Sequence, residues 1–365
     1  MKKPGYICPF LSRILLFSHV FLVLFTSCDG AIHLPANVTV PALFAFGDSI
    51  VDQGNNNAIR TVVKCDFPPY GKDFQAGFPS GRFSNGRTPP DLIADELGIK
   101  ELIPAYLDPN LTARDLRTGV SFASGGSGYD PQTSRLVSVI PMSDQLNQFK
   151  ECIGKLKGLV GEEGATNILS QALFLLVAGT DDLANTYFTI GIRKMQYDLY
   201  SYADFIVGSA TNFVQELYKL GARRFAVFGI PPIGCLPLQR TVTGGSLRSC
   251  SVSYNQAAQM VNSKLSPRLD ALNQDLPQSR VVYIDIFNPL FDIIQHPLNY
   301  GFEVNDKGCC GTGNIETVVL CNRYSWTCTD SSKYVFWDSY HPTEKAYKIL
   351  VHQIVQKYVD SFFGM

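Results

Sequence analysis

Four short apolar runs recur along the chain, and each ends in glycine, proline or a polar turn. They read "PALFAFGDS", "ALFLLVAGTDD", "RRFAVFGIPP" and "RVVYIDIF". Continuous runs rich in Val, Phe and Leu are typical of strands buried on both faces, as in a parallel sheet covered by helices. Helical patterns separate these runs, at about 88–97, 143–157, 196–220, 252–273 and 343–362. Strands that alternate with helices predict a doubly wound α/β domain with a central parallel sheet.

The first thirty residues follow a different pattern. Lys2, Lys3 and Arg13 precede the apolar stretch "ILLFSHVFLVLF", which leads into the small and polar "TSCDGA". That order is typical of a secretory signal, and the apolar stretch is shorter than the roughly 20 residues that span a membrane. A retained anchor is the alternative. We therefore expect a signal peptide at 1–30 and a single domain at 31–365.

Two further features favour a secreted, extracellular protein. Asn37 and Asn110 each begin an N-x-T sequence, the acceptor for N-glycosylation. Eight cysteines remain after the signal, and an even number in an exported chain predicts disulfides. They are Cys65, Cys152, Cys235, Cys250, Cys309, Cys310, Cys321 and Cys328. Cys235 with Cys250 and Cys321 with Cys328 would close local loops, while the adjacent Cys309 and Cys310 are expected to take different partners.

Composition narrows the function classes. Hydrophobic residues make up 45% of the chain and charged residues 17%, which is ordinary for a globular protein. Lys plus Arg number 31 and Asp plus Glu 32, with no basic block, so a nucleic-acid partner is not expected. Neither C-x-x-C nor H-E-x-x-H occurs, so no metal site is predicted. We expect no cofactor and no obligate protein partner.

Ser49 directly follows the first apolar run, in "FGDSIVDQGNNN". Ligands of doubly wound folds bind at the carboxyl ends of the strands, so a hydroxyl at this place suits a nucleophile. The alternative is that Asp48 and Ser49 only begin a turn or cap a helix. We expect Asn55 and Asn56 to organise the turn after Ser49.

A serine nucleophile needs a general base, usually histidine, and that histidine needs an orienting partner. In "FWDSYHPTEKAY", Asp338 lies three residues before His341, and Pro342 disfavours helical geometry at His341. The other four histidines lie in the signal, in the tail after it, behind an apolar helix and within the last helix. His341 is therefore the candidate base, with Asp338 as its partner.

Seven blocks of the chain together resemble plant GDSL-type esterases/lipases of the SGNH hydrolase superfamily. They are "FAFGDSIVDQGNNN", "GRFSNGRTPPDLIADELG", "GVSFASGGSG", "VAGTDDLANTY", "GIPPIGCLP", "GCCGTG" and "DSYHPTEKAY". The resemblance implies a flavodoxin-like three-layer α/β/α fold. It also implies Ser49 as nucleophile, His341 as base and Asp338 as its partner. The backbone N–H groups of Ser49 and Gly126 would contribute to the oxyanion hole.

The chain departs from the family pattern twice. Ile50 replaces the leucine of the GDSL block, a swap of similar volume that should be harmless. The third block normally reads G-x-N-D, and the asparagine amide donates a hydrogen bond to the oxyanion. Here Asp181 stands at that position, followed by Asp182. The "DD" form resembles extracellular-lipase-type plant members.

An ionised Asp181 cannot donate a hydrogen bond and would repel the developing negative charge. Losing one oxyanion donor typically costs about 10²–10³ in rate. Three outcomes stay open. In the first, Asp181 lies in a site sheltered from water, with Asp182 helping to raise its pKa, and donates as a neutral acid, so that activity is greatest at mildly acidic pH. In the second, the backbone donors act alone in a slow enzyme. In the third, hydrolysis has been lost.

The sequence therefore predicts a secreted serine esterase that hydrolyses carboxylic esters of lipid or small acyl type through an acyl-enzyme on Ser49. An acyltransferase with the same three residues is one alternative, because an alcohol can replace water as the acceptor. A non-catalytic extracellular lipid- or glycan-binding protein is the other, and Asp181 is the feature that favours it. "GIPPIGCLP" is expected to shape the wall of the acyl pocket, or else to be a rigid loop held by Cys235.

Overall fold

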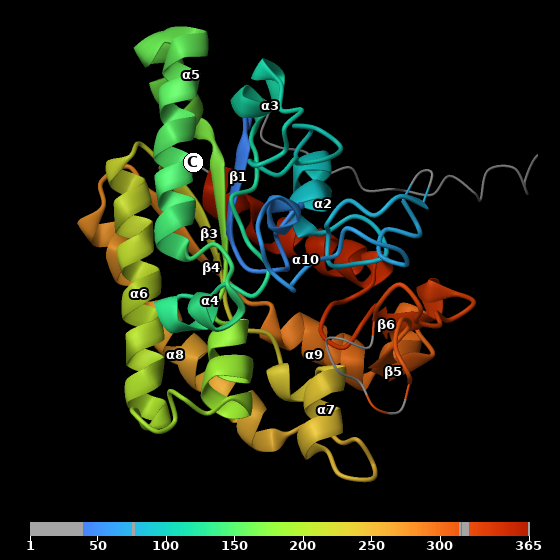
Figure 1. Ribbon diagram of the computed structural model, residues 1–365. Helices are drawn as coiled ribbons and strands as arrows, with labels where there is room; N and C mark the ends of the chain where they lie inside the picture. The colour runs from blue at the N-terminus through green and yellow to red at the C-terminus, as the bar shows by residue number, and fades with distance from the viewer. Residues whose placement is uncertain (1–38, 75–76, 314, 316–320, 364–365) are drawn as a thin grey trace, which may run out of the picture. The chain divides into compact units, whose positions relative to one another are not determined.

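Four parallel strands form the central sheet, in the order β1-β2-β3-β4 (Figure 1). They are β1 (Leu43–Gly47), β2 (Leu173–Val177), β3 (Arg224–Phe228) and β4 (Arg280–Ile284). The computed structural model describes residues 39–74, 77–313, 315 and 321–363. Each strand falls within one of the four apolar runs, and β1 and β2 are buried along their whole length. The predicted signal and Asn37 lie outside the described residues.

The topology places Ser49 where doubly wound folds bind ligands. On the far side of β1 from β2, Ser121 forms a parallel bridge with Ala45. If the segment around Ser121 is counted as the second element, the order becomes 2-1-3-4-5, which is the flavodoxin-like order. Chain connections leave β1 in opposite directions at this point, and Ser49 lies two residues beyond its carboxyl end.

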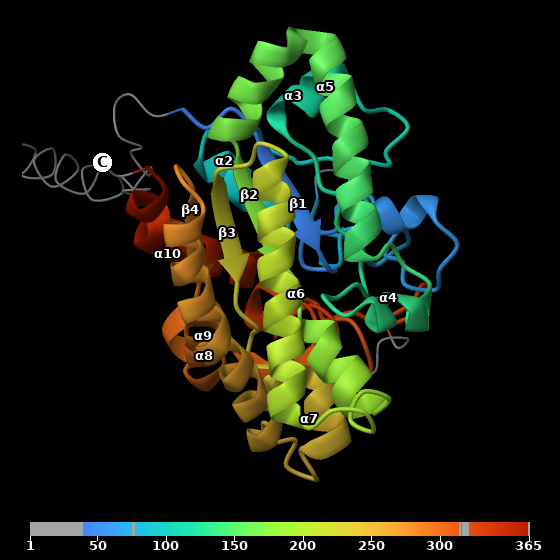
Figure 2. The ribbon, with the colours of Figure 1, turned by 90° about the vertical axis from the view of Figure 1, so that its left-hand side faces the viewer.

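Helices cover both faces of the sheet (Figures 1 and 2). α5 (Met142–Gln171), α6 (Leu199–Lys219) and α8 (Val252–Asp275) pack on one face, and α2 (Pro89–Glu96) and α10 (Glu344–Phe363) on the other. Shorter helices are α3 (Ala113–Thr118), α4 (Pro131–Val137), α7 (Pro237–Thr243), α9 (Phe287–Gln295), the 3₁₀ turns η1 (Asn55–Ala58), η4 (Ile233–Cys235), η5 (Pro297–Tyr300) and η7 (Ser331–Lys333), and the π-helix η3 (Asp182–Thr189). None of the helices in the described ranges is long and apolar enough to cross a membrane.

An aromatic cluster fixes β1 between its neighbours. Phe46 stacks on Phe122 with ring centroids 5.0 Å apart and meets Phe149 of α5 edge-on at 5.4 Å. Phe44 contacts Phe174 of β2 at 5.4 Å. All five rings are fully buried, and such pairs add to the free energy of simple burial. The end of β1, and with it Ser49, is therefore held on a rigid base.

The disulfides correct one expectation. Cys235 pairs with Cys250 as predicted, but Cys321 pairs with Cys310, and Cys328 with Cys309. The predicted Cys321–Cys328 loop is wrong because the backbone N–H of Cys328 donates to the carbonyl of Cys309, which puts these two residues side by side. The adjacent pair does take different partners. Cys65 and Cys152 are buried thiols without a disulfide.

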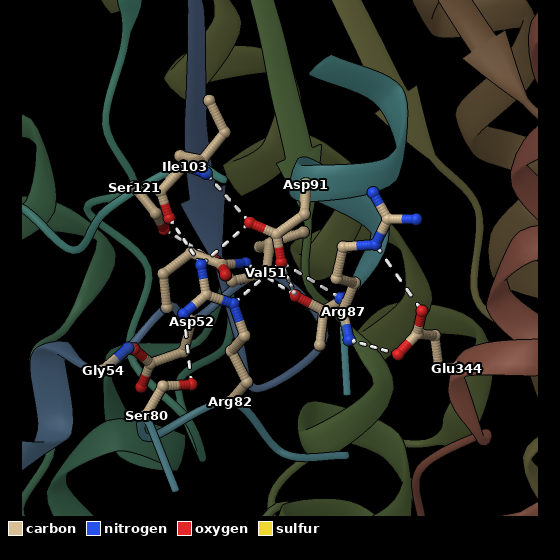
Figure 3. Close-up of polar contacts among 12 residues, drawn as sticks. Val51, Asp52, Gly54, Ser80, Arg82, Arg87, Asp91, Ile103, Ser121 and Glu344 are labelled. Atoms are coloured by element: carbon tan, nitrogen blue, oxygen red, sulfur yellow. Dashed lines mark hydrogen bonds and ion pairs between the residues drawn. The ribbon is translucent and has the colours of Figure 1, made fainter. Parts of the chain in front are cut away.

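A buried ion pair holds the loop before α2 (Figure 3). Arg82 donates to both carboxylate oxygens of Asp91, at 2.7 and 2.8 Å, and to the carbonyl of Ile103 at 2.8 Å. In the same loop the N–H of Arg87 donates to Glu344 at the start of α10. A buried pair needs such additional hydrogen bonds to offset its loss of hydration. This network ties α2 to the beginning of α10, next to His341.

Candidate active site

Gly47 allows β1 to pass very close to β2 just before Ser49. Its φ is +134°, and a Cβ built at this position would lie 1.8 Å from the carbonyl oxygen of Val177. No side chain fits there, so glycine is required. The Gln145 side chain of α5 accepts from the N–H of Gly47 at 2.8 Å and donates to its carbonyl at 2.9 Å. These contacts fix where the chain turns into Ser49.

The structure brings Ser49, His341 and Asp338 into one hydrogen-bonded line. The Nε2 atom of His341 lies 2.7 Å from Ser49 Oγ, and its Nδ1 atom lies 2.9 Å from each carboxylate oxygen of Asp338. Asp338 Oδ1 also accepts the N–H groups of Tyr340 at 2.8 Å and His341 at 2.7 Å. This arrangement can deprotonate the serine and stabilise the imidazolium that results.

The carboxyl group of Asp338 is held in its ionised form. Burial raises its pKa, but attraction to His341 and the hydrogen bonds it accepts outweigh burial, so the pKa lies below its ordinary value. Tyr70 contributes another donor: its hydroxyl lies 2.8 Å from Asp338 Oδ2. The sequence did not single out Tyr70, because 268 residues separate the two partners and no spacing signal links them.

The loop that carries Gly126 is clamped by the block after Ser49. The N–H of Gly125 donates to Asp52 at 2.9 Å, and the amide of Asn56 donates to the Gly125 carbonyl at 2.9 Å. Asn55 holds the carbonyl of Ala123 at 2.8 Å. Asn55 and Asn56 therefore do more than organise their own turn. Within the described ranges, the N–H groups of Ser49 and Gly126 donate no hydrogen bond, so both are available to an oxyanion.

Asp182 holds the other end of the same loop. It accepts hydrogen bonds from the N–H groups of Tyr129 at 2.8 Å and Asp130 at 3.2 Å, and from the hydroxyl of Thr133 at 2.5 Å. The side chain is fully buried, and burial raises its pKa to about 7. Asp182 thus positions the loop from within the protein.

Asp181 lies on the cavity beside Ser49 and His341. Its Oδ1 accepts a hydrogen bond from the Asn185 amide at 2.6 Å, and Asn185 in turn accepts one from the Tyr340 hydroxyl at 2.6 Å. Burial raises the pKa of Asp181 to about 6, against the lowering effects of His341 and Asn185. The rise expected from shelter from water is found, but the added contribution expected from Asp182 is wrong, because the Asp182 carboxyl is engaged by the loop.

The cavity that opens on Ser49 is mostly apolar. It lies at the carboxyl edge of the sheet, between the ends of β2 and β3, α9 and α10. Asp48 also lines it. Burial, followed by the nearby Asp181, raises the pKa of Asp48 well above its ordinary value. None of the residues that line the cavity is Lys or Arg.

The remaining predicted sites lie elsewhere. Asn110 is exposed in a turn before α3, where a glycan could be attached. His296 pairs with Asp292, and His352 lies near Glu96, both away from Ser49. In the described part of the chain, no group of three or more His, Cys, Asp or Glu is arranged to hold a metal ion. That the protein works without a metal stays a prediction.

Asn185 was not singled out from the sequence, although its spacing from Asp181 could have indicated it. It lies four residues after Asp181, in the π-helix η3 that follows β2. Side chains four residues apart are neighbours on a helix surface, so this spacing alone points to Asn185 as a polar partner of Asp181.

Comparison with known proteins identifies the family. The family described as GDSL-like Lipase/Acylhydrolase matches residues 43–354. The GDSL esterase/lipase EXL3 of Arabidopsis thaliana is 58% identical over 351 residues, which cover 96% of this chain and 95% of that protein. A second Arabidopsis GDSL esterase/lipase is 54% identical over 331 residues, covering 90% of this chain and 89% of its own.

Among solved structures, a catalytic mutant of Axe2, an acetylxylan esterase from Geobacillus stearothermophilus, aligns with a TM-score of 0.42 and 11% identity. The alignment covers 88% of this chain and 94% of the other, and the fold described above does not depend on it. The family match and the relatives at more than half identity carry the assignment. This chain belongs to the GDSL-like lipase/acylhydrolase family, with the α/β fold of SGNH hydrolases, and it is a carboxylic ester hydrolase.

Proposed function

We propose that the protein is a secreted serine esterase in which Ser49 is the nucleophile, His341 the general base and Asp338 its orienting partner. The observation that carries this proposal is the continuous hydrogen-bonded line from Ser49 Oγ through His341 to Asp338, at the mouth of an apolar cavity. Ser49 attacks the ester carbonyl while His341 takes its proton. His341 then gives that proton to the leaving alcohol, and water activated by the same imidazole releases the acid.

Asp181 acts in this proposal as a neutral donor to the oxyanion. The Asn185 amide donates to Oδ1, so the proton of a neutral Asp181 belongs on Oδ2. Within the part of the chain that the structure describes, Oδ2 has no hydrogen-bond partner, and Asp181 lines the cavity. The N–H groups of Ser49 and Gly126 supply the other two donors. A buried carboxylic acid kept neutral by its surroundings can serve as such a donor.

Secretion and glycosylation belong to the same proposal. Three disulfides support an oxidising compartment, and the exposed Asn110 supports glycan attachment there. The complete line of three residues favours catalysis over a purely binding role, because a binding protein has no need of a base aligned on a serine. Acyl transfer would use the same residues, and adding an alcohol acceptor to the assay below separates it from hydrolysis by the product formed.

The test is hydrolysis of p-nitrophenyl acetate by the secreted, disulfide-bonded protein at about pH 4 to pH 9, with Ser49→Ala beside it. We expect saturable hydrolysis that Ser49→Ala reduces to background. Stoichiometric labelling of Ser49 by a fluorophosphonate would identify the acyl-enzyme position. A wild-type protein that neither hydrolyses the ester nor takes the label would contradict the proposal.

A further inference from the structure

The cavity beside Ser49 has two unlike ends. Its polar end holds Ser49, Asp181 and His341. Its deeper wall is apolar and comes from the end of β3, the "GIPPIGCLP" segment, α9 and α10: Phe228, Leu236, Leu290, Leu350, Val351 and Ile354. These six side chains are buried, at 7% exposure or less. A reacting carbonyl at the polar end would therefore leave the rest of an acyl group facing hydrocarbon.

A second apolar cavity continues in the same direction. It lies between the sheet and α10, and its walls include Leu175 of β2, Ala226 of β3 and Val355 of α10. Phe228 and Ile354 line both cavities. These two side chains therefore form the partition where the first cavity ends and the second begins.

We propose that the first cavity is the acyl-chain site of the enzyme, that it takes apolar acyl chains, and that Phe228 and Ile354 set the longest chain it accepts. The proposal rests on Ser49 as the nucleophile. Among the described residues on its walls there is no Lys or Arg that would pair with an acyl group carrying a carboxylate or phosphate.

Burial of the chain predicts how rate depends on its length. One buried methylene contributes about 0.8 kcal/mol, which corresponds to about a fourfold gain in kcat/KM for each carbon that fits. The gain should stop when the chain reaches Phe228 and Ile354. Acyl chains that continue past this point would have to displace the partition.

The experiment compares kcat/KM for p-nitrophenyl acetate, hexanoate and decanoate in the wild type, Ile354→Phe and Ile354→Ala. The ratio between two esters within one preparation does not depend on the fraction of folded enzyme. We expect Ile354→Phe to lower the decanoate-to-acetate ratio at least tenfold, and Ile354→Ala to raise it. Leu217→Ala is the matched control, because Leu217 is a buried residue of α6 on the other face of the sheet. Equal ratios in all four proteins would overturn the acyl-chain site.

A binding measurement keeps this proposal apart from the proposed function. Ser49→Ala, which cannot turn over, is titrated with the neutral ester analogues 2-decanone and 2-butanone and followed by NMR. We expect 2-decanone to bind at least tenfold more tightly, and the added substitution Ile354→Phe to remove that preference. If no ester is hydrolysed but this preference is found, the nucleophile assignment fails and the cavity assignment stands. If both ketones bind equally while esters are hydrolysed, the nucleophile assignment stands and the cavity assignment fails.

Discussion

The two sides of Ser49 hold buried carboxyl groups whose pKa values are shifted in opposite directions. On one side Asp338 is 3% exposed and its pKa is lowered, while on the other Asp181 is 7% exposed and its pKa is raised to about 6. Burial is thus nearly equal and does not separate them. The difference lies in their partners: Asp338 accepts two backbone N–H groups, the Tyr70 hydroxyl and the imidazole, whereas Asp181 accepts one amide.

Asp182 shows which of these partners matters most. It accepts three hydrogen bonds, yet its pKa is raised to about 7. Three donors without a neighbouring cation do not offset full burial here. The direct contact with His341 is what sets Asp338 apart. One site can therefore hold an ionised carboxylate that stabilises the imidazolium and a neutral acid that can donate to the oxyanion.

The largest expected effect comes from removing the charge on the His341 side. Asp338→Asn keeps the shape of the side chain, but its amide can donate to Nδ1 and so favour the wrong tautomer of His341. A change of this kind costs about 10⁴ in kcat in serine proteases, and we expect a similar loss here. Measurement of kcat at pH 7, with the melting temperature as a control for folding, tests this. A loss of less than tenfold in a folded variant would mean that Asp338 is not the partner of the base.

The next effect comes from the Asp181 side and depends on pH. Asp181 donates only while protonated, so the share of competent wild-type enzyme falls tenfold per pH unit above about pH 6. In Asp181→Asn the introduced amide donates at every pH and still has Asn185 beside it. We expect the ratio of kcat/KM in the variant to that in the wild type to rise above pH 6 and to reach about 10² near pH 8, within the range of one oxyanion donor.

The ratio compares two proteins that differ at Asp181 alone. A ratio that stays constant between about pH 4 and pH 9 would show that the wild type does not use the proton of Asp181. The backbone donors would then form the oxyanion hole alone.

A smaller effect is expected in stability, from Asp182. Asp182→Ala removes the acceptor of two backbone N–H groups in the Gly126 loop and leaves them buried. Unpaired buried donors cost about 1–3 kcal/mol of unfolding free energy, which urea denaturation at pH 5 would measure. Thr133→Val is the matched control, because it removes one donor to Asp182 and leaves the acceptor in place. If Asp182→Ala were as stable as the wild type, Asp182 would not be what holds this loop.

Asp182 should also make the free energy of unfolding depend on pH. Since its folded-state pKa is about 7, above the ordinary value of 3.8, the folded protein binds more protons than the unfolded chain between these values. Its contribution makes the free energy of unfolding fall as pH rises from about 4 to about 7. Asp182→Ala should lose that part of the slope.

The sequence predicted what depends on local pattern. The four strands were found because each is a continuous apolar run. Ser49, Asp338 and His341 were predicted as candidates because they occupy short, specific blocks. The helix predicted at 143–157 continues to Gln171 as α5, past a break at Gly161 with φ 76°, where "GLVGEEG" hides the periodicity. The small sheet of β5 (Val304–Gly308) and β6 (Tyr334–Phe336) was not predicted, because β5 carries the polar sequence "VNDKG".

Contacts made only by the tertiary fold could not be predicted in this way. The pairing of Cys309 with Cys328 depends on a backbone hydrogen bond between their segments. The partition between the two cavities combines Phe228 of β3 with Ile354 of α10, which are brought together by packing across the sheet. The contact of Tyr70 with Asp338 also depends on the tertiary fold. Its removal has the smallest expected effect, and it tests why the two sides of Ser49 differ.

Tyr70→Phe removes one hydrogen bond to Asp338 and leaves the ring in place among Phe67, Phe83 and Trp337. A hydrogen bond to a charged group is worth about 1.5 kcal/mol, so we expect about a tenfold fall in kcat/KM near pH 7. Loss of a donor to the ionised form also raises the pKa of Asp338.

The matched control is Phe67→Leu, which alters the packing against the Tyr70 ring without touching the hydroxyl. A purely structural role for Tyr70 would lower kcat/KM in both variants to a similar extent. A fall in kcat/KM in Tyr70→Phe alone would instead show that the hydroxyl supports Asp338 as the partner of His341. The contrast between the two sides of Ser49 would then extend one residue beyond His341 and Asp338, to a donor that Asp181 lacks.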